Sequence, residues 1–209
     1  MTEIIKKLEN NNMKGYYAKD KAEALEILKT LIPEGSTVAV GGSVTLNECG
    51  VIEYVRNGNF NFLDRYNPNL SRDEIQDIHR QSLIADVYLS SSNAITQDGV
   101  LYNVDGNSNR VGAIVFGPKS VIIIVGKNKI VKNLDEAVKR VKTIAAPKNA
   151  KRLNCETYCA VKGVCKGVDG EMCDGCNSPS RICCNYLVSA QQRQKDRIKV
   201  ILVDENLGY

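Results

Sequence analysis

Cysteine is the residue type in this sequence that points most directly to chemistry. Seven of the eight cysteines fall in one short stretch, with the spacing Cys155-x3-Cys159-x5-Cys165-x7-Cys173-x2-Cys176-x6-Cys183-Cys184. Its C-x-x-C unit encloses Asp174-Gly175, a turn that lets both sulfurs reach one metal centre. Two further thiolates would complete a tetrahedral zinc site or a four-iron cluster, and no histidine lies nearby to replace them.

Free thiols and disulfides are the alternatives to a metal centre. The N-terminus has no apolar stretch that could serve as a signal peptide, so we expect a cytoplasmic protein. Cytosolic thiols stay reduced, which argues against a disulfide-rich flap. Residues 154–184 are rich in Cys and Gly and poor in aliphatic side chains. The sequence therefore predicts a metal- or cluster-binding segment, with the remaining Cys49 as a small core residue.

A second motif, Gly41-Gly42-Ser43-Val44-Thr45, lies where a strand is expected to run into a helix. Glycines allow close backbone approach, and free N–H groups at a helix start favour an anion. Ser43 and Thr45 could add hydroxyl donors. A plain tight turn is the alternative, since the motif is neither a Walker A loop nor a complete dinucleotide fingerprint.

Alternating apolar and amphipathic segments must position these motifs. We expect strands at Thr37–Val40, Val87–Leu89, Val121–Val125 and Lys199–Val203, and a turn at Asp98-Gly99. The first thirty residues look helical, with Asp20 as an N-cap, and Val111–Phe116 is ambiguous. Further helices are expected at Val44–Arg56, from the Ser71/Glu74 capping box to Ile84, and at Leu134–Ala145. The pattern predicts an α/β fold with a mostly parallel sheet and helices on both faces, interrupted near the C-terminus by the cysteine-rich segment.

Composition limits the classes of partner. The net charge is only +4, Trp is absent and aromatic residues make up 6%, so nucleic-acid binding is not expected. The longest apolar run, Val121–Val125, is too short to cross a bilayer.

The chain resembles the LUD (lactate utilisation) domain family over roughly its whole length, residues 1–209, as a single domain. The matching stretches are Gly41–Leu46 with Glu48, Asn59–Tyr66, Ala85–Val87, Asn93–Thr96 with Asp98-Gly99, Asn103–Gly106 with Asn109-Arg110, Phe116–Lys119, and Ile201–Val203 with Leu207-Gly208.

The resemblance implies a fold like that of sugar-phosphate isomerases and CoA transferases, in which the loop matching Gly41–Thr45 commonly binds a phosphate or carboxylate. The family's polar motifs add Asn93, Asp105, Asn109 and Arg110 to the predicted anion site. Turn formation explains most of these residues, but a turn does not need a guanidinium. Arg110 could pair with a carboxylate or phosphate, and a salt bridge to Asp105 is the alternative.

Glu48 and His79 are the remaining candidates for acid–base chemistry. Glu48 follows the glycine loop by one helical turn and could act as a base or nucleophile; a solvated helix face is the alternative. His79, the only histidine, lies in an amphipathic helix, where a surface or core role is the more common one.

The resemblance also orders the cysteines, because related tails read Cys, C-x-x-C, then Ser-Pro-x-Arg-Ile-Cys. In this frame the ligands are Cys159, Cys173, Cys176 and Cys183, with Cys155, Cys165 and Cys184 as alternates. A lactate-linked redox role favours a [4Fe–4S] cluster over zinc. We therefore expect a redox-linked component of hydroxy-acid metabolism that binds a small anion, with redox proteins or further copies of the chain as partners. The alternatives are a non-catalytic subunit with structural zinc, and a CoA-transferase- or isomerase-like enzyme.

Overall fold

The computed structural model describes residues 1–209 and is built around a six-stranded parallel sheet. Its spatial order is β1 (Lys14–Ala18), β10 (Ile198–Val203), β7 (Ser120–Gly126), β4 (Val87–Ser90), β2 (Thr37–Val40) and β3 (Asn61–Leu63). Val121–Val125 of β7 is fully buried. The predicted central strand is thus confirmed, since apolar side chains on both faces suit the middle of a parallel sheet.

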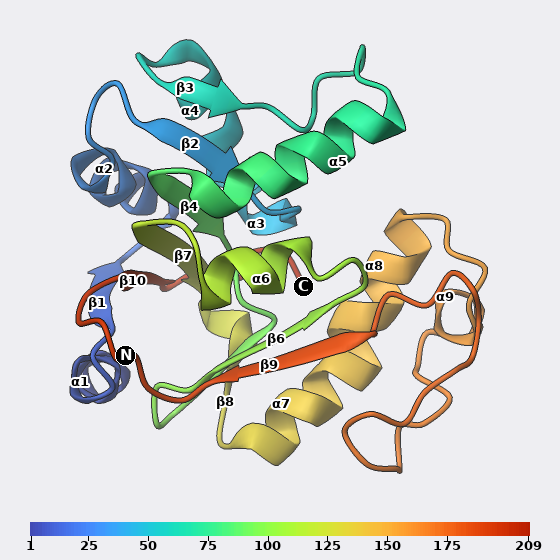
Figure 1. The fold of residues 1–209 in the computed structure, drawn as a ribbon. Helices are drawn as coiled ribbons and strands as arrows, with labels where there is room; N and C mark the ends of the chain where they lie inside the picture. Colours follow the sequence, from blue (N-terminus) through green and yellow to red (C-terminus); the bar gives the residue numbers. More distant parts are fainter.

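Helices cover both faces of this sheet, as predicted (Figure 1). Alternate strand residues point to opposite faces. One face packs on α2 (Lys21–Leu31), α3 (Val44–Glu48) and α4 (Val51–Asn57). The other packs on α1 (Thr2–Asn10) and α6 (Asn109–Val115). The ambiguous run 111–116 is therefore helical up to Val115, and Phe116 is the extended residue that ends the helix.

Capping residues fix two of the predicted helix starts. The Asp20 carboxylate accepts the Glu23 N–H at the start of α2. Ser71 and Glu74 form the predicted capping box of α5 (Arg72–Gln81), which continues into η1 (Ser82–Ile84). Each cap satisfies backbone N–H groups that have no partner inside the helix.

Two segments differ from the expected helices. Residues 14–18 are strand β1 at the sheet edge, where Gly15 lets α1 approach closely; a Cβ there would lie 2.9 Å from Ile5 Cγ2. The predicted helix Val44–Arg56 is broken into α3 and α4, because Gly50 takes a left-handed conformation with φ of 69°.

A second, four-stranded sheet was not expected from the sequence. Its order is β8 (Ile130–Val131), β5 (Ala94–Thr96), β6 (Leu101–Asp105) and β9 (Asn185–Ser189). β5 and β6 form an antiparallel hairpin through the predicted Asp98-Gly99 turn. β9 follows the cysteine-rich segment directly and pairs antiparallel with β6. The cysteine-rich segment is therefore anchored to the second sheet.

The helix expected at Leu134–Ala145 extends further and changes geometry along its length. It consists of α7 (Leu134–Arg140), a π-helical turn η3 (Val141–Ala145) and α8 (Ala146–Arg152). Pro147 has no N–H to give to a carbonyl one turn earlier, which disrupts the α-helical hydrogen bonding there. The chain then forms the short helix α9 (Tyr158–Lys162) before the irregular part of the cysteine-rich segment. None of the helices has the length and apolar character needed to cross a membrane.

Candidate functional site

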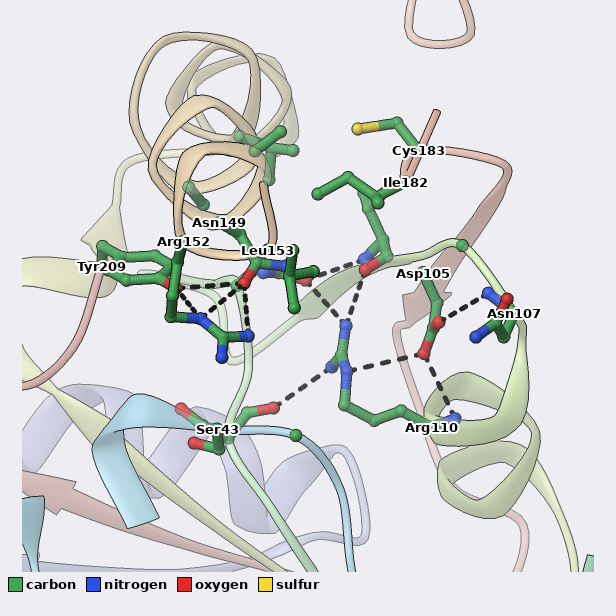
Figure 2. Close-up of a pocket in the computed structure, with 18 of the residues that line it drawn as sticks. Ser43, Asp105, Asn107, Arg110, Asn149, Arg152, Leu153, Ile182, Cys183 and Tyr209 are labelled. Carbon is green, nitrogen blue, oxygen red and sulfur yellow. Dashed lines mark hydrogen bonds and ion pairs between the residues drawn. The ribbon is translucent and has the colours of Figure 1, made fainter. Parts of the chain in front are cut away.

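A cavity of about 370 Å³ lies where the parallel sheet meets the second sheet and α8. Its walls come from the loops after β2 and β4, the turn between β6 and α6, Lys129 of η2 (Lys127–Lys129), the η3–α8 helix, residues 179–183 and Tyr209. Loops at the carboxyl ends of parallel strands are the usual ligand site of α/β sheets. In Figure 2, Asn149, Arg152 and Tyr209 gather on one side of the pocket, and Asp105, Asn107 and Arg110 on the other.

The charges around the pocket are predominantly positive. The only acidic side chain that lines it is Asp105. The lining cations are Arg65, Arg110, Lys129, Arg152 and Arg181. Arg65 makes no side-chain hydrogen bond or ion pair within the protein, so its guanidinium is free to bind a ligand. This balance suits a small anion.

The glycine-serine loop contributes most of its predicted residues to the pocket. Gly42, Ser43 and Thr45 line it. Gly41 lies behind them, where a Cβ would come within 3.0 Å of the Arg110 side chain and the Tyr88 hydroxyl. The Ser43 hydroxyl caps α3 by accepting the Leu46 N–H at 3.2 Å. Thr45 is fully buried and donates to the Leu207 carbonyl at 3.3 Å.

Arg110 lines the pocket with Asn93, Asp105 and Asn109, as grouped from the sequence. Its terminal nitrogens, however, already donate within the protein: Nη1 to Asn103 Oδ1 at 2.5 Å and Ser91 O at 3.3 Å, Nη2 to Asn93 Oδ1 at 3.0 Å and Val104 O at 2.7 Å. Its Nε lies 3.6 Å from Asp105 Oδ2. The geometry therefore favours the salt bridge between Arg110 and Asp105 over direct ligand binding by Arg110. Arg110 orders the loop that forms this wall of the pocket.

Glu48 and His79 both lie outside the pocket lining. The exposed Glu48 carboxylate accepts the Gly208 N–H at 2.7 Å and so ties down the C-terminal tail. His79 is buried, and neither ring nitrogen has a hydrogen-bond partner. Burial, and next the charge of Arg65, hold the pKa of His79 below its ordinary value, which keeps the imidazole neutral.

A second, much smaller cavity of about 30 Å³ lies within the cysteine-rich segment. Four of the seven clustered cysteines line it: Cys159, Cys165, Cys176 and Cys183. Three of these belong to the expected ligand set, but Cys165 takes the place of the exposed Cys173. Cys155 and Cys184 lie outside the lining. All eight cysteines are free thiols, and Cys49 is buried in the core, as predicted.

The donor set around this small cavity fits a thiolate-bound metal centre. It offers four soft sulfur ligands and no histidine. The sulfurs do not form a preassembled coordination sphere, since no three His, Cys, Asp or Glu side chains are arranged to hold an ion. Burial and the neighbouring Cys159 and Cys165 raise the pKa of Cys183 to about 12. A cation at the centre would reverse this effect and favour the thiolates.

Two basic side chains hold the segment around the cavity. The Arg181 guanidinium donates to the carbonyls of Cys173, Cys176 and Cys183 at 2.8 to 2.9 Å. The buried Lys142 ammonium donates to Gly167 O at 2.6 Å, Gly170 O at 3.1 Å and Glu171 O. The order of this segment therefore comes partly from hydrogen bonds that these two cations donate to its carbonyls.

The two cavities share a wall. Five residues line both of them: Val141, Ala146, Arg181, Ile182 and Cys183. A group bound between the sulfurs would thus be separated from a ligand in the larger pocket by a single layer of side chains.

The sequence matches the family model of the LUD domain over residues 1–203. The chain belongs to the LUD domain family. Among solved structures, this LUD domain is similar to a DUF162 family protein from Deinococcus radiodurans, with 15% identity and a TM-score of 0.53, over 97% of this chain and 94% of that one. At this identity the likeness concerns the fold. A search of curated proteins finds no match.

Arg65 and Arg152 line the pocket of this LUD domain without having been predicted from the sequence, and so does Lys129. Lys129 is 3% exposed, and its Nζ lies 2.7 Å from Thr45 Oγ1 and 2.9 Å from Ser91 Oγ. In sequence it stands in Lys127-Asn-Lys129, which looks like an ordinary polar turn. Only the pairing of β7 with its neighbours, followed by the tight turn η2, brings this side chain under the glycine-serine loop.

Proposed function

We propose that this LUD protein is a redox-linked component of lactate or related hydroxy-acid metabolism, with a small carboxylate in the larger pocket and a [4Fe–4S] cluster on the cysteine cavity. The shared wall of the two cavities carries this proposal. A structural zinc site needs no contact with a ligand pocket, whereas an electron-transfer centre does.

The pocket supports the carboxylate part of the proposal by its charge. Arg65 lacks an internal partner, and Arg152 reaches only the neutral groups Asn149 Oδ1 and Tyr209 Oη. A guanidinium with unused donors can bind a carboxylate in bidentate fashion. Arg65 and Arg152 are therefore the groups proposed to hold the acid.

The sulfur donors support the cluster part. Cys159, Cys176 and Cys183 are the proposed ligands, and either Cys165 or Cys173 is the fourth. Cys165 lines the cavity. Cys173 does not, but it stands three residues before Cys176 in the C-x-x-C turn, and Arg181 donates to its carbonyl. When bound, such a cluster supplies one-electron transfer. The positive charge of Arg181 would offset the negative charge of a four-thiolate cluster.

The isomerase-like alternative receives less support. It needs a free carboxylate in the pocket. Asp105, the one carboxylate there, lies beside the Arg110 guanidinium, and Glu48 instead accepts the Gly208 N–H of the tail. The zinc alternative uses the same thiols, so metal analysis must separate it from the cluster.

The cluster is tested by anaerobic purification, followed by measurement of iron, zinc and acid-labile sulfide per chain. We expect iron and sulfide in nearly equal amounts in the parent protein and in the control Cys49→Ala. Cys176→Ser should lose most of both. Comparing Cys165→Ser with Cys173→Ser identifies the fourth ligand, because only the true ligand variant should lose iron. Zinc without sulfide, or no metal in any preparation, would contradict the cluster.

The carboxylate site is tested by calorimetry with lactate and with its neutral amide. We expect binding of lactate only, and at least a tenfold weaker affinity in Arg65→Met. Arg193→Met serves as the control, because Arg193 lies outside the pocket lining. Equal binding of acid and amide would contradict an anion site.

A further inference from the structure

Lys129 is held in a setting that is unusual for a lysine. Its side chain is almost completely buried, and no carboxylate lies within ion-pair distance of Nζ. Its only hydrogen-bond partners are two hydroxyl groups, Thr45 Oγ1 and Ser91 Oγ. A buried ammonium normally has a charged partner or several strong acceptors. Lys142, with three carbonyl acceptors, shows the usual arrangement.

The two hydroxyls match a neutral amine. Thr45 directs its own proton to the Leu207 carbonyl, and Ser91 to the Ser92 carbonyl. Both oxygens are therefore free to accept from Lys129. A neutral amine has two N–H groups and one lone pair; the two N–H groups are satisfied by the two oxygens, and the lone pair remains unused. Lys129 is one of the residues that line the pocket, and we take this lone pair to face a ligand there.

The electrostatic surroundings also favour the neutral form. Burial lowers the pKa of Lys129 to about 7, and the nearby charges of Arg140 and Arg110 act in the same direction. Glu48 acts in the opposite direction but is a smaller influence. A substantial fraction of Lys129 is therefore an unprotonated, nucleophilic amine at neutral pH.

We propose that Lys129 is a nucleophile that forms an imine with a 2-oxo acid bound in the pocket. This rests on the proposed carboxylate site and narrows its ligand class to the oxidised partner of a 2-hydroxy acid. The Nζ lone pair attacks the carbonyl carbon and forms a C–N bond. The carbonyl oxygen leaves as water with the two protons of the amine, so amine and ketone give imine and water, and no oxidant or reductant is consumed.

The reaction is tested by trapping with pyruvate and cyanoborohydride, with the purified full-length protein at pH 7. Hydride from the reagent reduces the imine to a stable secondary amine, which mass spectrometry locates. We expect one adduct per chain, on Lys129, and none with lactate, which has no ketone. Lys129→Met and Lys129→Arg should both lose the adduct completely. Lys127→Met should keep it, since Lys127 is an exposed neighbour paired with Asp204.

The possible results separate this proposal from the proposed function. If pyruvate and lactate both bind by calorimetry but no adduct forms on Lys129, the imine is ruled out and the carboxylate site stands. An adduct that persists in the Lys129 variants also overturns the imine. If neither acid binds, the carboxylate site itself is wrong, and the imine proposal falls with it.

Discussion

Arg110 and Lys129 are both buried basic side chains at the pocket, and their surroundings differ in one respect. Arg110 is surrounded by oxygen acceptors and lies beside the Asp105 carboxylate. Lys129 has two neutral hydroxyls and no carboxylate partner. A cation that is fully paired supports structure, whereas one that is buried without a counter-charge destabilises the fold and is available for chemistry.

This difference predicts how stability depends on pH in a Lys129→Met variant. The pKa of Lys129 is about 7 in the folded protein and about 10.4 when unfolded. Between these values the unfolded chain binds more protons, so raising the pH stabilises the parent, by at most about 1.4 kcal/mol per pH unit. The variant lacks this contribution. We expect the variant to be more stable than the parent at pH 7 and the difference to shrink toward pH 10.

Chemical denaturation of both proteins between pH 6 and 10 measures this difference. Lys127→Met controls for loss of a surface lysine. A stability difference that does not change with pH would show that Lys129 is protonated in the folded protein throughout this range.

At the scale of elements, the π-helical turn η3, between α7 and α8, makes hydrogen bonds to the cysteine-rich segment. In η3, the Ala146 N–H bonds to Val141 O, five residues back. Pro147 cannot supply the next N–H, and the Lys142 carbonyl instead accepts the Cys165 N–H at 2.8 Å. The Lys142 side chain binds the carbonyls of the loop 167–171. Lys142 of the π-turn therefore holds the cysteine-rich segment by both its backbone carbonyl and its side chain. Single π-turns inside α-helices are frequent at functional sites.

Lys142→Met is expected to loosen the loop that carries Cys165 and Cys173. Three carbonyls lose a charged donor, which should cost on the order of 3 kcal/mol of local stability. Hydrogen exchange of residues 163–176 should accelerate, while strands β7 and β10 stay protected. Lys139→Met is the matched control, because Lys139 is exposed on the same helix. Unchanged exchange in Lys142→Met would mean that other contacts hold the loop.

At the scale of the whole molecule, the pocket lies between two sheets that the chain builds in different ways. The parallel sheet carries the two large hydrophobic cores. The second sheet has the smaller third core, which includes Cys183 and Tyr186 at its edge. Figure 1 shows β9 leaving the cysteine-rich segment and running alongside β6. Metal binding should therefore stabilise the second sheet and not the first.

Removal of the proposed cluster tests this division. After loss of metal through Cys176→Ser, we expect faster hydrogen exchange in residues 155–189, including β9, and no change in β7 or β10. Loss of protection in β7 would show that the cysteine-rich segment supports the entire fold. Equal protection everywhere would show that metal contributes no order to it.

The sequence by itself determined the features that depend on neighbouring residues. The apolar run Val121–Val125, the caps at Asp20 and Ser71 and the turn at Asp98-Gly99 are set by local propensity and periodicity, and all are present in the structure. The motifs also grouped Gly42, Ser43, Thr45 and Arg110 into one site, because loops at the ends of parallel strands converge.

Only the tertiary structure decided the features that depend on pairing between distant segments. Strand β9 exists because it pairs with β6, more than eighty residues earlier in the chain. Lys129 gains its buried position from Thr45 and Ser91, and Glu48 is taken away from the pocket by Gly208. The placement of Cys165 on the small cavity follows from its backbone bond to Lys142. Such contacts leave no pattern in the sequence, because burial and charge pairing depend on which segments meet in space and not on their separation along the chain.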